Sequence, residues 1–137
     1  MAHPAIARSG AFHKILVLVS LLQILAVFLQ GAFAGSFLSG DDSSVALHEM
    51  GGWTVLALAL IQLGMLAARP GRSYGLWLLM SSVGIVLAES LQIGSGYGRF
   101  LRVHLPLALL IAGGLTWQIL WIAKHPRAVA TSADGTS

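Results

Sequence analysis

Long runs of apolar residues alternate with short polar segments along most of the sequence. Four of these runs approach or exceed the roughly 20 residues that an α-helix needs to cross the hydrocarbon core of a bilayer. Because lipid offers the backbone no hydrogen-bond partner, such segments cross membranes as helices. The pattern predicts spans at about residues 14–35, 45–68, 75–95 and 103–124.

The composition is that of a chain in contact with lipid. Apolar residues make up 56% of the 137 residues and charged residues only 9%, whereas a soluble domain carries about 25% charged residues. We therefore expect an all-α integral membrane protein, a four-helix bundle with up-down-up-down order. Residues 1–126 would form one domain, and residues 127–137, which have no apolar period, a disordered tail.

The first apolar run has features of a secretory signal. Arg8 and Lys14 precede it, and Ala32 and Ala34 form an A-x-A motif near its end. The run is longer than the 7–15 residues of an ordinary signal sequence. We expect it to be retained as the first span.

Lys and Arg residues indicate the orientation. Six of the eight fall on one side of the predicted membrane: Arg8, Lys14, Arg69, Arg72, Lys124 and Arg127. Since basic residues concentrate in cytoplasmic loops, we expect a multi-pass protein of the cell membrane with both termini cytoplasmic. These residues follow helix ends and not one helix face, so the net charge of +3 indicates topology and gives no reason to expect nucleic-acid binding.

The residues that are missing exclude several kinds of chemistry. The chain contains no cysteine, which excludes disulfides, iron–sulfur clusters and thiolate zinc sites. The sequence also lacks a nucleophile–base pair, a phosphate-binding loop and an all-oxygen metal cage. It therefore gives no indication of an enzymatic activity.

The chain resembles two copies of one helical hairpin. The segment LQGAFAG is followed by a loop, Leu47-His48 and an apolar helix. The segment LQIGSGYG is followed by a loop, Val103-His104 and an apolar helix. Gln30 thus matches Gln92, and His48 matches His104. Both hairpins start on the same side, which indicates a parallel repeat about an axis along the membrane normal.

The two matched histidines lie at the same predicted depth. His48 precedes the expected end of its span by 20 positions (68 − 48), and His104 precedes Lys124 by 20 positions (124 − 104). At the helical rise of about 1.5 Å per residue, each lies roughly 30 Å from the cytoplasmic ends. Two imidazoles facing each other at one level can supply both axial ligands of a haem iron, so His48 and His104 are candidate metal ligands.

Small and basic residues near the histidines fit a flat cofactor. Gly51 and Gly52 lie three and four residues beyond His48 on the same helix face, where they would leave room for a porphyrin. Arg99 and Arg102 depart from the charge asymmetry and could pair with haem propionates. In the alternative interpretation, the histidines bond interfacial groups and the glycines only let helices pack closely.

Glu89 is a carboxyl residue well inside the third span. Charged residues inside spans are costly and usually have a functional or paired role. Glu89 is therefore a candidate proton or polar site. A structural role, through interhelical hydrogen bonds with Gln23, Gln30 or Gln62, is the alternative.

The segments quoted above, together with LHEMGG at the second span and VHLPLA at the fourth, resemble one four-helix half of haem A synthase over about residues 14–124. The family's two halves each hold a haem between histidines at the heads of their second and fourth helices, so the resemblance implies His48 and His104 as ligands. The catalytic half has a glutamate where this chain has Val45, and many members carry a loop cysteine pair that is missing here. The resemblance thus implies haem holding without the oxidative chemistry.

Three functions remain. The first is a membrane protein that binds haem b between His48 and His104 and serves electron transfer or haem holding beside a respiratory or haem-processing complex. The second is a structural accessory subunit of a larger membrane complex, without a cofactor. The third is a small transporter that acts as a homo-oligomer and uses Glu89 to carry protons.

Overall fold

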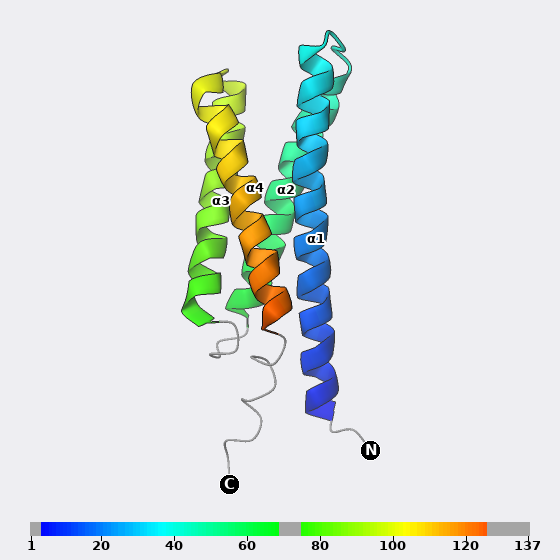
Figure 1. Ribbon diagram of the computed structural model, residues 1–137, viewed down its shortest axis with the longest axis vertical. Helices are drawn as coiled ribbons and strands as arrows, with labels where there is room; N and C mark the ends of the chain where they lie inside the picture. The colour runs from blue at the N-terminus through cyan, green and yellow to red at the C-terminus, as the bar shows by residue number, and fades with distance from the viewer. Residues whose placement is uncertain (1–3, 69–74, 126–137) are drawn as a thin grey trace.

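The computed structural model, which describes residues 4–68 and 75–125, is a bundle of four α-helices (Figure 1). Its helices are α1 (Pro4–Leu38), α2 (Ser44–Ala67), α3 (Gly75–Tyr97) and α4 (Leu101–Lys124). This confirms the predicted all-α class. The predicted tail at 127–137 and the two basic residues Arg69 and Arg72 lie outside the described residues.

All four helices are long and apolar enough to cross a membrane. The last three begin and end within about three residues of the predicted spans, whereas α1 begins ten residues before its predicted span. Hydropathy marks the apolar part of a helix and not its end, and Pro4 suits the first position of a helix because its fixed φ is already helical. Large apolar side chains are exposed on every helix, which fits contact with lipid acyl chains.

The helices form a ring in which each one packs against its neighbours in sequence. α1 contacts α2 and α4, and α3 contacts α2 and α4, so α2 and α4 lie diagonally opposite. We call the end where residues 39–43 and 98–100 join the helices the hairpin end. At the other end, the terminal end, α1 begins and α4 finishes (Figure 1).

Apolar side chains fill two levels of the interior. A cluster of Leu16, Leu66, Leu78 and Ile122 takes one residue from each helix near the terminal end. A second cluster lies nearer the middle and contains Ala59, Ile85, Ile111 and Leu115.

Buried polar residues form a hydrogen-bonded layer between these two clusters. Ser20 Oγ donates to Gln62 Oε1 at 3.0 Å, and Gln62 Nε2 donates to Gln118 Oε1 at 2.7 Å. Gln118 Nε2 in turn donates to Ser81 Oγ at 2.9 Å, and Ser82 Oγ lies 3.4 Å from Gln62 Nε2. We call Ser20, Gln62, Ser81, Ser82 and Gln118 the polar belt. It joins all four helices, and such interhelical bonds help hold helices together in lipid.

The layers match the predicted repeat residue by residue. Leu16, Ser20 and Gln30 on α1 correspond to residues 62 positions later on α3 (for example 82 − 20), which are Leu78, Ser82 and Gln92. His48, Gln62 and Leu66 on α2 correspond to residues 56 positions later on α4 (118 − 62), which are His104, Gln118 and Ile122. The second hairpin therefore repeats these interior positions of the first.

Replacing Gln62 with Leu should destabilise the bundle. The side chain keeps a similar volume but loses its bonds to Ser20 and Gln118, and a buried polar group left without its partner costs about 1–3 kcal/mol. Thermal unfolding in detergent, followed by circular dichroism, would measure the loss. Thr116→Val is the control, because the exposed Thr116 hydroxyl bonds only Ala112 O in its own helix. An equal effect of both variants would contradict the role of the belt.

Candidate functional site: a histidine pair at the hairpin end

His48 and His104 face each other across the bundle at the hairpin end. They lie in the first turns of the diagonal helices α2 and α4, and both are half-buried. Their ring centroids are 6.0 Å apart and their ring planes are inclined by 64°. The sequence predicted a shared level, and the structure brings the two rings together.

Each histidine is held by the preceding helix through the same contact. His48 Nδ1 lies 3.1 Å from the backbone oxygen of Gln30, and His104 Nδ1 lies 3.0 Å from that of Gln92. Ser95 Oγ is a further neighbour of His104 Nδ1, at 3.3 Å. A carbonyl oxygen can only accept, so Nδ1 carries a hydrogen in both rings, and the lone pair of a neutral ring is then on Nε2. Metal-binding histidines are commonly oriented by such a bond from the other ring nitrogen.

The ring separation of 6.0 Å is close to the value expected for two imidazoles whose Nε2 atoms both point at one metal ion. With each metal–nitrogen bond about 2 Å long and each nitrogen about 1.1 Å from its ring centroid, the centroids would lie about 6.3 Å apart. Among the described residues, no group of three or more His, Cys, Asp or Glu is placed to hold a metal ion. The described residues therefore provide no third side chain of these types beside the histidine pair.

The glycines beside His48 let α1 approach α2. A Cβ at Gly51 would overlap the side-chain amide of Gln30, and one at Gly52 would lie 3.9 Å from Gln30 Oε1. The space predicted beside Gly51 is thus taken up by the Gln30 carboxamide. Its Nε2 is buried and has no hydrogen-bond partner within the described ranges. Across the bundle, a Cβ at Gly96 would lie 3.0 Å from His104 Cε1, so this glycine makes room for the second ring.

Arg99 and Arg102 lie at the same end as the histidines. Arg99 is in the α3–α4 turn with φ 56°, and Arg102 is in the first turn of α4. Both are exposed, and neither forms an ion pair within residues 4–68 and 75–125. Both cations therefore remain available to an anionic group near the hairpin end.

Glu89 lies inside the bundle on α3, with 4% of its surface exposed. Its Oε1 atom has no hydrogen-bond partner in the part of the chain that the structure describes. No bond joins Glu89 to the glutamines that sequence analysis suggested for it; the amide of Gln62 is engaged in the polar belt, and the Gln23 amide is itself buried without a partner.

Sequence reasoning missed a contact between α2 and α3 near the histidines. Tyr97 donates its hydroxyl hydrogen to Glu49 Oε1 and accepts a bond from Trp53 Nε1. Glu49 and Trp53 are four residues apart and share one face of α2. The four-residue spacing was the feature of the sequence that could have indicated a shared partner. That this partner is Tyr97 depends on how α3 packs against α2.

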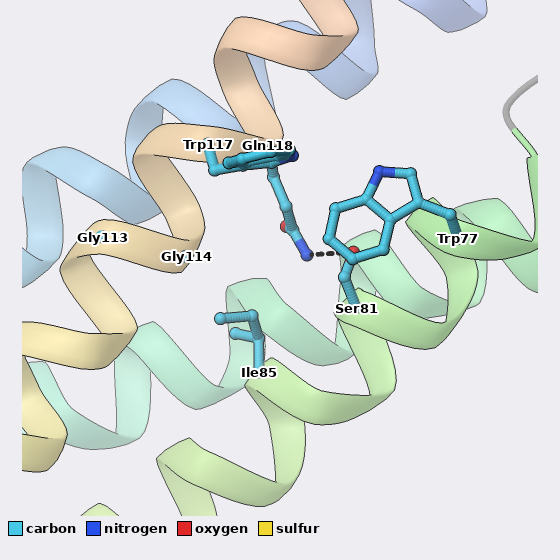
Figure 2. Close-up of a pocket in the computed structure, with 7 residues that line it drawn as sticks. All are labelled: Trp77, Ser81, Ile85, Gly113, Gly114, Trp117 and Gln118. Atoms are coloured by element: carbon cyan, nitrogen blue, oxygen red, sulfur yellow. Dashed lines mark hydrogen bonds between the residues drawn. The ribbon is translucent and has the colours of Figure 1, made fainter.

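A separate hollow lies between α3 and α4 in the terminal half of the bundle (Figure 2). Its volume is about 310 Å³, and it is lined by Trp77, Ser81, Ile85, Gly113, Gly114, Trp117 and Gln118. The two exposed indoles lie 5.9 Å apart and nearly perpendicular. Its polar lining, Gln118 and Ser81, is already joined within the belt. The hollow is therefore a largely apolar surface feature, distinct from the histidine pair.

Comparisons with protein-family models, with curated protein sequences and with solved structures found no match to this chain. The site is therefore interpreted from its own geometry.

The hydrogen bonds fix the tautomer of both histidines. We expect nitrogen-15 nuclear magnetic resonance of ring-labelled protein to show a hydrogen on Nδ1 of both His48 and His104. Single substitution of each histidine would assign the signals. A ring without a hydrogen on Nδ1 would contradict the contacts to Gln30 and Gln92.

Proposed function

We propose that this chain is a membrane protein that binds haem b, with His48 and His104 as the two axial ligands. The observation that carries the proposal is the ring separation of 6.0 Å between two histidines on diagonal helices. Each ring has its Nδ1 bonded to a backbone oxygen, which leaves Nε2 as the nitrogen free to coordinate a metal.

The number of protein ligands favours haem over a bare metal ion. Within the described residues, no third His, Cys, Asp or Glu joins the two histidines in a metal-binding group, whereas a porphyrin brings four nitrogens of its own. When bound, haem supplies one-electron chemistry, and two axial histidines leave no open position for oxygen. Electron transfer or haem holding follows from this ligand set, and oxygen activation does not.

A flat group beside the pair would require the Gln30 carboxamide to turn away from Gly51. The carboxamide of Gln30 lies against Gly51, but its buried Nε2 has no hydrogen bond that a rotation would break. Because Gly51 and Gly52 have no side chains, no group at these two positions of α2 would have to move as well. Arg99 and Arg102 are exposed at the same end, where guanidinium groups suit the carboxylates of haem propionates.

The cellular setting of the proposal rests on sequence features. The distribution of Lys and Arg favours a cell-membrane protein with both termini in the cytoplasm, which puts the histidine pair near the outer face. The resemblance to one half of haem A synthase supports the ligand assignment and a partner among respiratory or haem-processing complexes. Val45 and the lack of cysteine argue against the oxidative reaction of that family.

Loss of either histidine should abolish stable haem binding. We expect protein purified from haem-supplied cells to show a Soret band and sharp low-spin bands on reduction, and His48→Ala or His104→Ala to lower haem affinity by more than about tenfold, since even outer-shell partners of a metal site are worth 10–100-fold. His125→Ala is the control, because this ring stacks on Trp121 at the terminal end. Protein that stays colourless with ample haem would contradict the proposal and favour the accessory-subunit alternative.

Neutralising the two arginines should weaken haem binding without removing it. A charge-assisted hydrogen bond contributes about 1.5–3 kcal/mol, so we expect an Arg99→Gln/Arg102→Gln variant to bind haem roughly tenfold or more weakly while keeping its low-spin spectrum. Haem titration of the apoprotein measures the affinity. Lys124→Gln serves as the charge control because Lys124 lies at the terminal end of α4. Equal haem affinities of the wild type, the double arginine variant and Lys124→Gln would show that the two arginines do not contribute to haem binding.

A further inference from the structure

Buried polar atoms without partners gather in one part of the interior. Among the described residues there are five such atoms, contributed by Gln23 and Gln30 on α1 and by Glu89 and Gln92 on α3. All lie between the polar belt and the histidine pair. Gln23 is fully buried and Glu89 is 4% exposed, so bulk water does not reach them directly.

The repeat places residues of α1 level with residues 62 positions later on α3, so that Glu89 is level with Val27 (89 − 62). On this common scale, the unpartnered residues lie at levels about one helical turn apart. Gln23 lies about one turn beyond Ser20 of the belt, and Glu89 about two turns beyond Ser82. Gln30 and Gln92 lie almost one turn farther than Glu89, next to the histidines that contact their backbone oxygens. The unpartnered polar groups thus occupy successive levels between the polar belt and the histidine pair, with Glu89 at an intermediate level.

The unmet hydrogen bonds point to bound water. Buried polar groups in proteins are almost always paired, with protein or with ordered water. A buried water molecule typically bonds to several otherwise unpaired polar groups. The side chains of Gln23, Glu89, Gln30 and Gln92 supply both donors and acceptors, so water can satisfy them where no protein group does.

No basic residue within the described ranges compensates a charge on Glu89. Arg8 and Lys14 lie in the part of α1 that precedes Leu16 of the terminal cluster, and Arg99, Arg102 and Lys124 lie at helix ends. The helices α2 and α4 that pack against α3 bring Ala59, Ile111 and Leu115 to this region. The titratable groups nearest to Glu89 from those helices are His48 and His104, and α1 contributes none there. An isolated charge at this depth is costly, so the charge of Glu89 depends on the charge at the histidine pair.

We propose that Glu89 exchanges protons with water bound in this interior, and that it takes up one proton when one electron is added at the histidine pair. This inference rests on the proposed haem function. A haem held by the pair would accept one electron from an external one-electron reductant, and the Glu89 carboxylate would become a carboxylic acid with one proton that bulk solvent supplies through the bound water. The site loses one positive charge and one negative charge together, so the interior keeps its net charge.

The proposal is tested by redox titration of the haem-loaded protein over the neutral pH range. We expect the midpoint potential of the wild type to fall by up to about 59 mV per pH unit, the value for one proton per electron, and that of Glu89→Gln to be independent of pH. Glu49→Gln, which removes an exposed carboxyl next to His48, should keep the wild-type slope. A flat wild-type profile, or an unchanged slope in Glu89→Gln, would overturn the proposal.

A second measurement needs no haem and separates the two proposals. Infrared titration of the apoprotein should show the carbonyl band of a buried carboxylic acid in the wild type and lose it in Glu89→Gln. Absence of that band from the wild type would overturn the role of Glu89. Failure of the protein to bind haem would refute the proposed function, whereas bound haem with a potential independent of pH would refute only the proton uptake.

Discussion

Polar groups inside a membrane bundle have to be satisfied by other groups inside it, and this constraint organises the interior of the protein. Near the terminal half, Gln62 and Gln118 meet in the polar belt and join all four helices. At the hairpin end, the two histidines bond to backbone oxygens of the preceding helices. These bonds, at two separate levels, set the rotation and depth of α2 and α4 and so determine how the imidazoles face each other.

The repeat explains why two histidines lie at one level. Each hairpin places its histidine against the backbone of its own first helix. Because the two hairpins are related by an axis along the bundle, the second histidine lies opposite the first. The departures from the repeat are then informative. Glu89 corresponds to Val27 (89 − 62), and Gly51 corresponds to Leu107 (107 − 56). The proposed proton site and the glycine against which the Gln30 carboxamide packs lie at these unmatched positions.

Much of the fold followed from the sequence, because lipid leaves few alternatives to a helix in an apolar run of this length. The common depth of His48 and His104 also followed, since it needs only the helical rise. The sequence did not reveal that Gln30 fills the space beside Gly51 or that Tyr97 bonds Glu49, because those contacts depend on how neighbouring helices are rotated. The sequence also contained an indication of the polar belt, because Gln62 and Gln118 are 56 positions apart (118 − 62), as His48 and His104 are (104 − 48).

The electron paramagnetic resonance spectrum of the oxidised, haem-loaded protein tests most directly whether two histidines hold one iron. The ring separation of 6.0 Å predicts a low-spin ferric signal with two nitrogen axial ligands, which turns high-spin or disappears when either His48 or His104 is replaced. A high-spin signal from the unaltered protein, or a low-spin signal that survives both single replacements, would contradict the account.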